Sequence, residues 1–256
     1  MPLIDVHCHI DLPDFDGDRE IVIRQAKEKG IVALINSGLG LVSGHKTLRL
    51  SEEFHGYVYS TLGLEPYNLN EEEFGEAERL ILENRGAIVG IGEVGLDYYW
   101  SRREEARRLQ RERFRSFIHL ARELDLPLIV HSRSAGKYAL QILEEEGVER
   151  VLLHAFDGSL GWAMTGVKLG YFFSIPTSVW HSSQKQKLAK HLPLSHIMVE
   201  SDSPVLSPFG RERNVPANLA YAVKKIGEIK GVEETIVENE TFQNAVNFFQ
   251  LKGVQI

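Results

Sequence analysis

The sequence predicts an α/β protein that forms a (β/α)8 barrel, with residues 1–256 in a single domain. Three observations favour this fold. The chain has 256 residues, which is in the range of one such barrel. Short runs rich in valine, isoleucine and leucine recur along it, as expected for strands buried on both faces of a parallel sheet. Amphipathic segments separate these runs, and a strict alternation of strand and helix is typical of βαβ units.

Eight apolar runs qualify as buried strands. They span Leu3–His7, Ile31–Ser37, Tyr57–Leu64, Ala87–Glu93, Leu128–His131, Val151–Ala155, Tyr171–Ser174 and Ile197–Glu200. Eight strand–helix units in one domain favour a closed barrel, although alternation alone also allows an open, doubly wound sheet.

Three of the segments between these strands carry helix signals. Asp18 is predicted to be the N-cap of a helix that ends near Gly30. Two later helices, the second starting at about Glu233, each present one apolar stripe. The stripes consist of Phe114, Phe117, Ile118, Ala121 and Leu124 in one helix and of Phe242, Ala245, Val246 and Phe249 in the other.

The composition limits the possible classes of protein. With 43% hydrophobic and 25% charged residues, it is that of a soluble globular protein with one large core. No apolar run approaches the roughly 18 to 20 residues of a membrane span, and no signal region precedes the first strand. The single cysteine, Cys8, agrees with a reducing compartment. We therefore expect a cytoplasmic protein without membrane contact.

The formal net charge of −7 argues against a broad basic surface for nucleic acid. It does not exclude a nucleic-acid substrate, because bound cations would change the charge locally.

Two histidines stand at the end of the first strand. His7 and His9 are separated by one residue, and side chains alternate along a strand. Both imidazoles therefore point to the same side and can reach one cation, while Cys8 points to the other side. Taken alone, such a pair can also be two polar residues at a strand end.

Four further candidate ligands follow other strands. Glu93 comes after an apolar run, and burying its carboxylate is costly unless it is paired or bound to a metal. His131 and His154 each follow a short apolar strand, and Asp202 follows the eighth. All six candidates thus fall at the carboxyl ends of predicted strands, where barrel enzymes carry their chemistry.

These motifs, in this order, resemble the TatD-type metal-dependent deoxyribonucleases of the amidohydrolase superfamily. The resemblance covers nearly the whole chain, and its most specific segments are Gly92-Glu93-Val94-Gly95-Leu96-Asp97 and Glu200-Ser201-Asp202-Ser203-Pro204. It implies a hydrolase that cleaves ester bonds, above all the phosphodiester bonds of DNA. No required protein partner is evident from the sequence.

The resemblance also implies two divalent cations per chain, with Glu93 as a bridging ligand and a catalytic residue. The other ligands are His7, His9 and Asp202 for one cation, and His131 and His154 for the second. Imidazole and carboxylate ligands suit zinc, manganese, iron, cobalt or nickel, and open positions would also admit magnesium. Asp202 is expected to act as general base toward the attacking water.

Several residues are candidates for substrate contact. Arg133 and Arg213, both in matched motifs, are expected to bind phosphate oxygens, with surface salt bridges as the alternative. The basic segment Arg102–Arg115 could guide a nucleic-acid strand, but its interleaved glutamates favour a solvated, ion-paired helix. Just before it, Trp100 and the two preceding tyrosines could stack on bases or simply pack the loop.

One motif departs from the family pattern. After the third strand the family usually has Gly-x-His-Pro, whereas this chain has Gly63-Leu64-Glu65-Pro66. A carboxylate at Glu65 would repel a phosphate. It therefore favours a second hypothesis, a small-molecule amidohydrolase of the lactonase, cyclic amidase or phosphotriesterase type. Hydrolysis of an ester on aminoacyl-tRNA and a non-catalytic barrel that binds a partner are further alternatives.

Overall fold

The computed structural model describes residues 2–251, 253 and 254, and strands alternate with helices through this part of the chain. The strands are β1 (Leu3–Cys8), β2 (Ile31–Leu39), β3 (Val58–Gly63), β4 (Ile88–Gly95), β5 (Leu128–His131), β6 (Val151–Leu153), β7 (Phe172–Pro176) and β8 (Ile197–Glu200). The α-helices are α1 (Arg19–Glu28), α2 (Gly40–Glu53), α3 (Glu71–Glu83), α4 (Glu104–Leu124), α5 (Gly136–Glu146), α6 (Leu160–Lys168), α7 (Ser183–His191), α8 (Leu219–Lys230) and α9 (Glu234–Phe249). Short 3-10 helices cover Pro13–Phe15, Thr177–Trp180, Leu194–His196 and Pro216–Asn218.

All eight predicted strands are present. β5 and β8 have the predicted bounds. The other strands differ from their predicted bounds by one or two residues at one end or at both ends. β6, for example, ends at Leu153 and not at Ala155, since Ala155 turns to a φ of 37°. The side chain of His154 therefore follows the strand and does not belong to it.

The strands form one eight-stranded sheet in the order β1 to β8. Neighbouring strands pair in parallel. Leu3 of β1, for example, lies opposite Ile31 of β2, and Leu153 of β6 lies opposite Phe173 of β7. The last strand, β8, contacts the first, β1, and the backbone N–H of Asp202 donates to the carbonyl of His7 at 3.0 Å. The fold is thus the predicted (β/α)8 barrel and not an open sheet. The prediction of a single domain over residues 1–256 stays a prediction.

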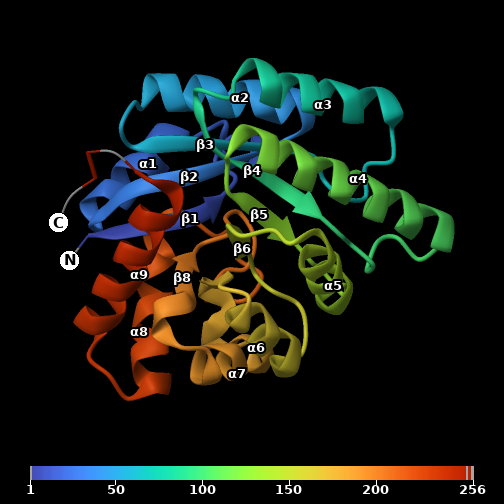
Figure 1. The fold of residues 1–256 in the computed structure, drawn as a ribbon. Helices are drawn as coiled ribbons and strands as arrows, with labels where there is room; N and C mark the ends of the chain where they lie inside the picture. Colours follow the sequence, from blue (N-terminus) through green and yellow to red (C-terminus); the bar gives the residue numbers. More distant parts are fainter. Residues whose placement is uncertain (1, 252, 255–256) are drawn as a thin grey trace. The chain divides into compact units, whose positions relative to one another are not determined.

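Two compact units can be described in turn. The first consists of the described part of Met1–Asn36, Leu50–Tyr59 and Ser174–Ile256. Its last two helices, α8 and α9, pack side by side, and α9 contacts both β1 and β8 (Figure 1). Phe242, Ala245 and Phe249 are buried on α9 as predicted, whereas Val246 is only half-buried and Phe248 is buried instead.

The second unit consists of Ser37–Arg49 and Ser60–Phe173. Its long helix α4 packs against β4 and α5 (Figure 1). Four of the five predicted stripe residues of α4 are buried, and Leu124, at its end, is half-buried. The stripe therefore faces the sheet and neighbouring helix, as its spacing predicts.

Two glycines of β4 allow β5 to come close beside Glu93. Gly92 has a φ of 153° and Gly95 a φ of 139°, values that side chains rarely allow. A Cβ on Gly92 would lie 2.6 Å from the Cβ of Ile129, and one on Gly95 would collide with the carbonyl of His131. The glycines of the Gly-x-Gly-Glu-x-Gly segment thus bring the ends of β4 and β5 together.

The predicted N-cap is correct in position but not in chemistry. α1 begins at Arg19, directly after Asp18, but the Asp18 side chain makes no capping hydrogen bond. Its two carboxylate oxygens accept from Arg213 instead, at 2.9 and 2.6 Å. Within the described residues, none of the helices combines the length and the apolar character that a membrane crossing requires.

Candidate metal centre

The first unit brings three predicted ligands together at the ends of β1 and β8. The Nε2 atoms of His7 and His9 are 3.1 Å apart. The Oδ1 atom of Asp202 lies 3.8 Å from Nε2 of His7 and 3.6 Å from Nε2 of His9. All three side chains are buried. The two imidazoles therefore converge on one side of the chain, as the alternation along β1 predicts.

Two residues that were given no role in the sequence analysis support this cluster. Asp5 is fully buried on β1, and its carboxylate accepts from the backbone N–H of Ser201 at 2.8 Å and from the Ser201 hydroxyl at 2.5 Å. Burial raises the pKa of Asp5 to about 7, and the bonds from Ser201 act in the opposite direction. These bonds tie β1 to the residue that precedes Asp202. The signal that could have revealed Asp5 is its period-two spacing with His7 and His9.

The second unit brings the other three predicted ligands together. Oε1 of Glu93 contacts Nδ1 of His131 and lies 3.0 Å from Nε2 of His154. The same two ring nitrogens are 3.3 Å apart. The three ligand atoms thus lie within 4.8 Å of one another, which is close enough for one cation to contact all of them.

The charges in this cluster are strongly coupled. Burial would raise the pKa of Glu93, but the positive charges of His154 and His131 and their hydrogen bonds hold it well below its usual range. Burial would likewise lower the pKa of His131, but the charge of Glu93 and the hydrogen bonds that His131 donates to Asp97 and Glu93 raise it. Glu93 is therefore an ionised carboxylate despite its burial.

Asp97 holds His131 in place. Its Oδ2 atom lies 3.1 Å from Nε2 of His131, which leaves Nδ1 directed at Glu93. Its Oδ1 atom accepts from the backbone N–H groups of Tyr99 and Trp100, at 3.0 and 2.9 Å. A carboxylate on the far nitrogen of a ligand histidine fixes its tautomer and orientation. In the sequence, Asp97 stands out only as part of the Gly-Glu-x-Gly-Leu-Asp motif, and the motif alone does not reveal this role.

The donor chemistry of both clusters fits a divalent cation. Each cluster offers two imidazoles and one carboxylate, the nitrogen and oxygen donors that zinc and related metals take. The Glu93 carboxylate is ionised while buried, which a cation would stabilise further.

The two arginines predicted to contact substrate differ in their surroundings. Arg133 follows β5, is exposed, and its guanidinium lies over the Tyr99 ring at 4.0 Å. Arg213 donates to the carboxylate of Asp18 and, at 2.6 Å, to the carbonyl of Asp14. Of the two roles that the sequence left open for Arg213, the geometry therefore supports the salt bridge.

The basic segment of α4 is mostly an ion-paired helix. Arg111 pairs with Glu104 at 2.6 Å within α4. Arg113 pairs with Glu71 on α3, and Arg115 pairs with Glu145 and Glu146 at the end of α5. Only one pair within this segment, Arg108 with Glu112 at 3.9 Å, has the i, i+4 spacing that the sequence favoured. Two of these arginines, Arg113 and Arg115, thus join α4 to neighbouring helices.

Glu65, the departure from the family motif, is half-buried in the loop after β3. Its charge, together with those of Glu93 and Asp97, acts on the phenol of Tyr67. Glu65 therefore belongs to the electrostatic surroundings of the Glu93 cluster.

A parallel (β/α)8 barrel with carboxylate and imidazole clusters at its strand ends defines a class, the metal-dependent hydrolases of barrel fold. The family model "TatD related DNase" matches residues 4–250. The human protein named Deoxyribonuclease TATDN3 is 42% identical over 96% of this chain and 94% of its own length. A Bacillus subtilis relative, the uncharacterized metal-dependent hydrolase YabD, is 30% identical over 97% of this chain and 99% of its own.

A solved structure agrees with these relatives. The TatD homologue YjjV of Escherichia coli superimposes with a TM-score of 0.89 at 25% identity, covering 97% of this chain and 98% of that one. The chain belongs to the TatD-related DNase family, and the predicted resemblance is confirmed.

Proposed function

We propose that this chain is a metal-dependent deoxyribonuclease in which the two ligand clusters hold two divalent cations in one binuclear centre. The observation that carries the proposal is the buried carboxylate of Glu93 at the end of β4, which contacts His131 and lies 3.0 Å from His154. A buried carboxylate in contact with two imidazoles is typical of a metal ligand.

The fold class is the reason for assigning both clusters to one centre. In a (β/α)8 barrel the carboxyl ends of all strands open on the same face, where the chemistry takes place. Glu93 would then bridge the cation bound by His131 and His154 and the cation bound by His7, His9 and Asp202.

Asp202 is the residue that we assign to proton transfer. Its Oδ1 atom lies 3.8 Å from Nε2 of His7 and 3.6 Å from Nε2 of His9, so the carboxylate would lie beside a water held at this cluster, whose proton it can accept. Two bound divalent cations supply positive charge, which polarises the phosphodiester and makes an adjacent water more acidic. Asp202 would accept the proton of this water as the water attacks phosphorus and the bond from phosphorus to the leaving sugar oxygen breaks. The leaving oxygen would take up a proton, which Asp202 can return, while Asp97 keeps His131 oriented.

The charge of the centre favours an anionic substrate. The six proposed ligands contribute two carboxylates and four imidazoles, so two divalent cations leave a net positive centre in a chain of net charge −7. Arg133, exposed after β5, adds a guanidinium that can donate to phosphate oxygens. The name of the human relative, Deoxyribonuclease TATDN3, supports DNA over the small esters and aminoacyl-tRNA that Glu65 had brought into consideration.

The metal and the location belong to the proposal as well. Imidazole and carboxylate donors favour zinc or manganese, with magnesium, cobalt, nickel and iron also compatible. The one cysteine, Cys8, is buried and has no second cysteine in the sequence with which to form a disulfide, in keeping with a cytoplasmic protein.

The decisive experiment is hydrolysis of end-labelled single-stranded and duplex DNA with added zinc, manganese or magnesium, beside a panel of lactones, small esters and aminoacyl-tRNA. We expect metal-dependent cleavage of DNA that a chelator abolishes. Turnover of a lactone or of aminoacyl-tRNA with no cleavage of DNA would overturn the assignment of the substrate.

Metal content tests the binuclear centre separately. Elemental analysis of protein purified without chelator should approach two equivalents of transition metal per chain. A value near zero, with no uptake of zinc or manganese, would overturn the binuclear centre whatever the substrate.

A further inference from the structure

The loop after β4 exposes an aromatic side chain although its backbone is firmly held. Trp100 is 63% exposed. Its backbone N–H donates to Asp97, the next carbonyl accepts from Arg107 at 2.9 Å, and the Ser101 hydroxyl accepts from Gln110 at 2.7 Å. A planar partner that stacked on this indole would bury its exposed area without first having to order the loop.

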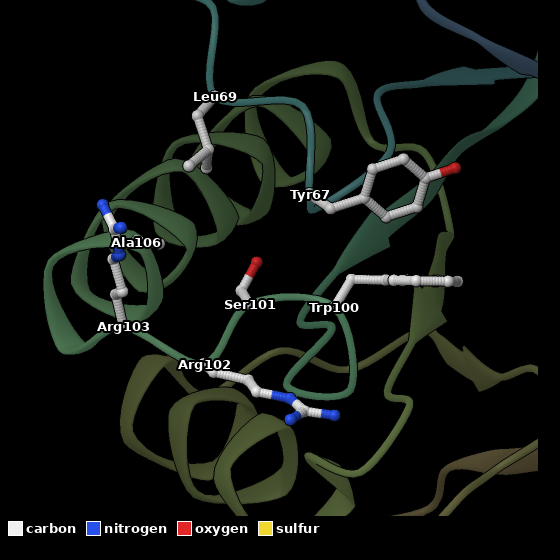
Figure 2. Close-up of a pocket in the computed structure, with 7 residues that line it drawn as sticks. All are labelled: Tyr67, Leu69, Trp100, Ser101, Arg102, Arg103 and Ala106. Carbon is white, nitrogen blue, oxygen red and sulfur yellow. The ribbon is translucent and has the colours of Figure 1, made fainter.

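A second exposed aromatic residue faces the same space from another loop. Tyr67, 48% exposed, follows β3, and it lines a pocket of about 680 Å³ together with Leu69 and Trp100. Figure 2 shows the rings of Tyr67 and Trp100 extending in the same direction from their two loops. The described residues contain no ring contact between Tyr67 and Trp100, so a planar group can enter between the two rings. The contacts of the indole are with the Tyr99 ring, edge-on with centroids 5.1 Å apart, and with the Arg133 guanidinium, 5.8 Å from the ring centroid.

The pocket also carries positive charge that is not committed elsewhere. Arg102 and Arg103 line it and are exposed. Unlike Arg111, Arg113 and Arg115, neither makes an ion pair or a side-chain hydrogen bond within the described residues. The side chain of Arg102 extends toward the same side of the view as the indole (Figure 2). Flat aromatic faces next to unpaired guanidinium groups complement the bases and phosphates of an unpaired nucleic-acid strand.

The pocket adjoins the Glu93 cluster. One oxygen of Asp97 holds the N–H of Trp100, and the other holds the Glu93 partner His131. Burial and the charges of Glu65, Glu93 and Asp97 raise the pKa of Tyr67 to about 12, so its phenol also lies within the field of this cluster.

We infer that the pocket between Tyr67 and Trp100 is a nucleotide subsite, in which an unpaired base of the DNA strand stacks on the indole while Arg102 and Arg103 contact backbone phosphates. The inference rests on the proposed deoxyribonuclease function and adds to it the residues that select an unstacked base. Duplex DNA would have to open at its end before a base could enter.

The test measures binding separately from cleavage. The full chain with its bound metal is titrated with two short phosphorothioate single strands that resist hydrolysis, one of thymidines and one with the same backbone but no bases. Tryptophan fluorescence and the anisotropy of a label on the strand report binding. The wild-type protein should bind the base-bearing strand more tightly, with quenching of indole fluorescence.

Substitutions of Trp100 then separate stacking from simple apolar contact. Trp100→Ala should lose the preference for the base-bearing strand, a loss of roughly tenfold or more in affinity. Trp100→Phe should keep most of the preference and Trp100→Leu should not. If Trp100→Ala retains the full preference, or if Trp100→Leu binds as well as Trp100→Phe, the stacking subsite is overturned.

Arg102→Ala tests the phosphate contact, with Arg108→Ala as the matched control. Arg108 is also an exposed arginine of this segment but pairs with Glu112. Arg102→Ala should weaken binding of both strands and lower the slope of log affinity against log salt by about 0.7. Arg108→Ala should leave that slope unchanged, and an equal slope for both variants would overturn the role of Arg102.

Failure of the subsite can be distinguished from failure of the proposed function. If the wild-type protein does not cleave an unmodified single strand with any metal, the function itself fails. If it cleaves the strand but Trp100→Ala leaves KM unchanged, the subsite alone fails.

Discussion

The two ligand clusters are built from the same types of side chain but are held together in different ways. In the Glu93 cluster the carboxylate contacts both imidazoles directly, and Asp97 holds the far side of His131. In the Asp202 cluster the Oδ1 atom of Asp202 lies 3.8 Å from Nε2 of His7 and 3.6 Å from Nε2 of His9. The supporting residue there is Asp5, which accepts from the backbone N–H and the hydroxyl of Ser201. Among the described hydrogen bonds, none joins Asp5 to a ring nitrogen of the cluster.

This difference indicates a division of labour. A carboxylate locked between two imidazoles is suited to hold a cation, because its charge and orientation are fixed before binding. A carboxylate within hydrogen-bond reach of the attacking water can take up its proton. We therefore assign metal retention mainly to the Glu93 cluster and proton transfer to Asp202.

The largest effect is expected for Asp202→Asn. The substitution keeps the size of the side chain and one oxygen, but it removes the charge and the ability to accept a proton. Turnover of DNA should fall by about 10²- to 10⁴-fold, while metal at the Glu93 cluster and the circular dichroism spectrum should be retained.

Near wild-type turnover of Asp202→Asn with intact metal would contradict the division between the clusters. Glu200, buried on β8 with Ser174 donating to it at 2.5 Å, would then be the next residue to test as base, through Glu200→Gln.

A smaller effect is expected for Asp97→Asn, which weakens the support of His131. Affinity of the Glu93 cluster for zinc should fall about 10- to 100-fold, as measured by calorimetric titration against a competing chelator. Asp97→Asn should leave the folded state intact, because Gln110 bonds to the backbone N–H of residue 97. Unchanged zinc affinity at the Glu93 cluster would contradict the supporting role of Asp97.

Glu65→His restores the residue type that the family usually has after β3. Removing a negative charge from the surroundings of the Glu93 cluster should raise the ratio of kcat/KM for DNA to that for a neutral ester by up to about tenfold, which corresponds to about 1.4 kcal/mol. Glu65→Gln, which removes the charge without adding an imidazole, is the matched control. An unchanged ratio in both variants would place Glu65 outside the path of the substrate.

The smallest effect is expected for Arg213→Ala, which removes the bidentate pair with Asp18 in the first unit. Exposed pairs of this kind contribute little to stability. The melting temperature should fall slightly and kcat/KM for DNA should not change. A drop in kcat/KM at an unchanged melting temperature would restore the substrate-contact role that the geometry disfavours.

The sequence predicted the strands and the ligands well because both depend on local patterns. A buried strand needs an apolar run, and the bounds of β5 and β8 follow directly from their runs. His7 and His9 face the same way because side chains alternate along any strand. The glycines around Glu93 are also visible in the sequence, although the reason for them, the close approach of Ile129 and His131, is not.

Other features depend on residues that are distant in the chain. The N-cap prediction for Asp18 was wrong in its chemistry because Arg213, 195 positions away, takes the carboxylate. The i, i+4 pairs expected for α4 are mostly replaced by bonds to residues on α3 and α5, such as that between Arg113 and Glu71. Side-chain partners of this kind depend on how helices pack, and local spacing carries no information about that.

By itself, then, the sequence determined the alternation of strands and helices, the family, and which residues stand at the strand ends. Only the tertiary structure decided which oxygen meets which nitrogen: that Asp97 holds His131, that Ser201 ties the end of β8 to Asp5, and that Trp100 stays exposed on a fixed loop. The physical reason is range. Backbone geometry and apolar periodicity act over a few residues, whereas a hydrogen bond needs two atoms about 3 Å apart, and for distant residues the packing of the whole intervening chain sets that distance.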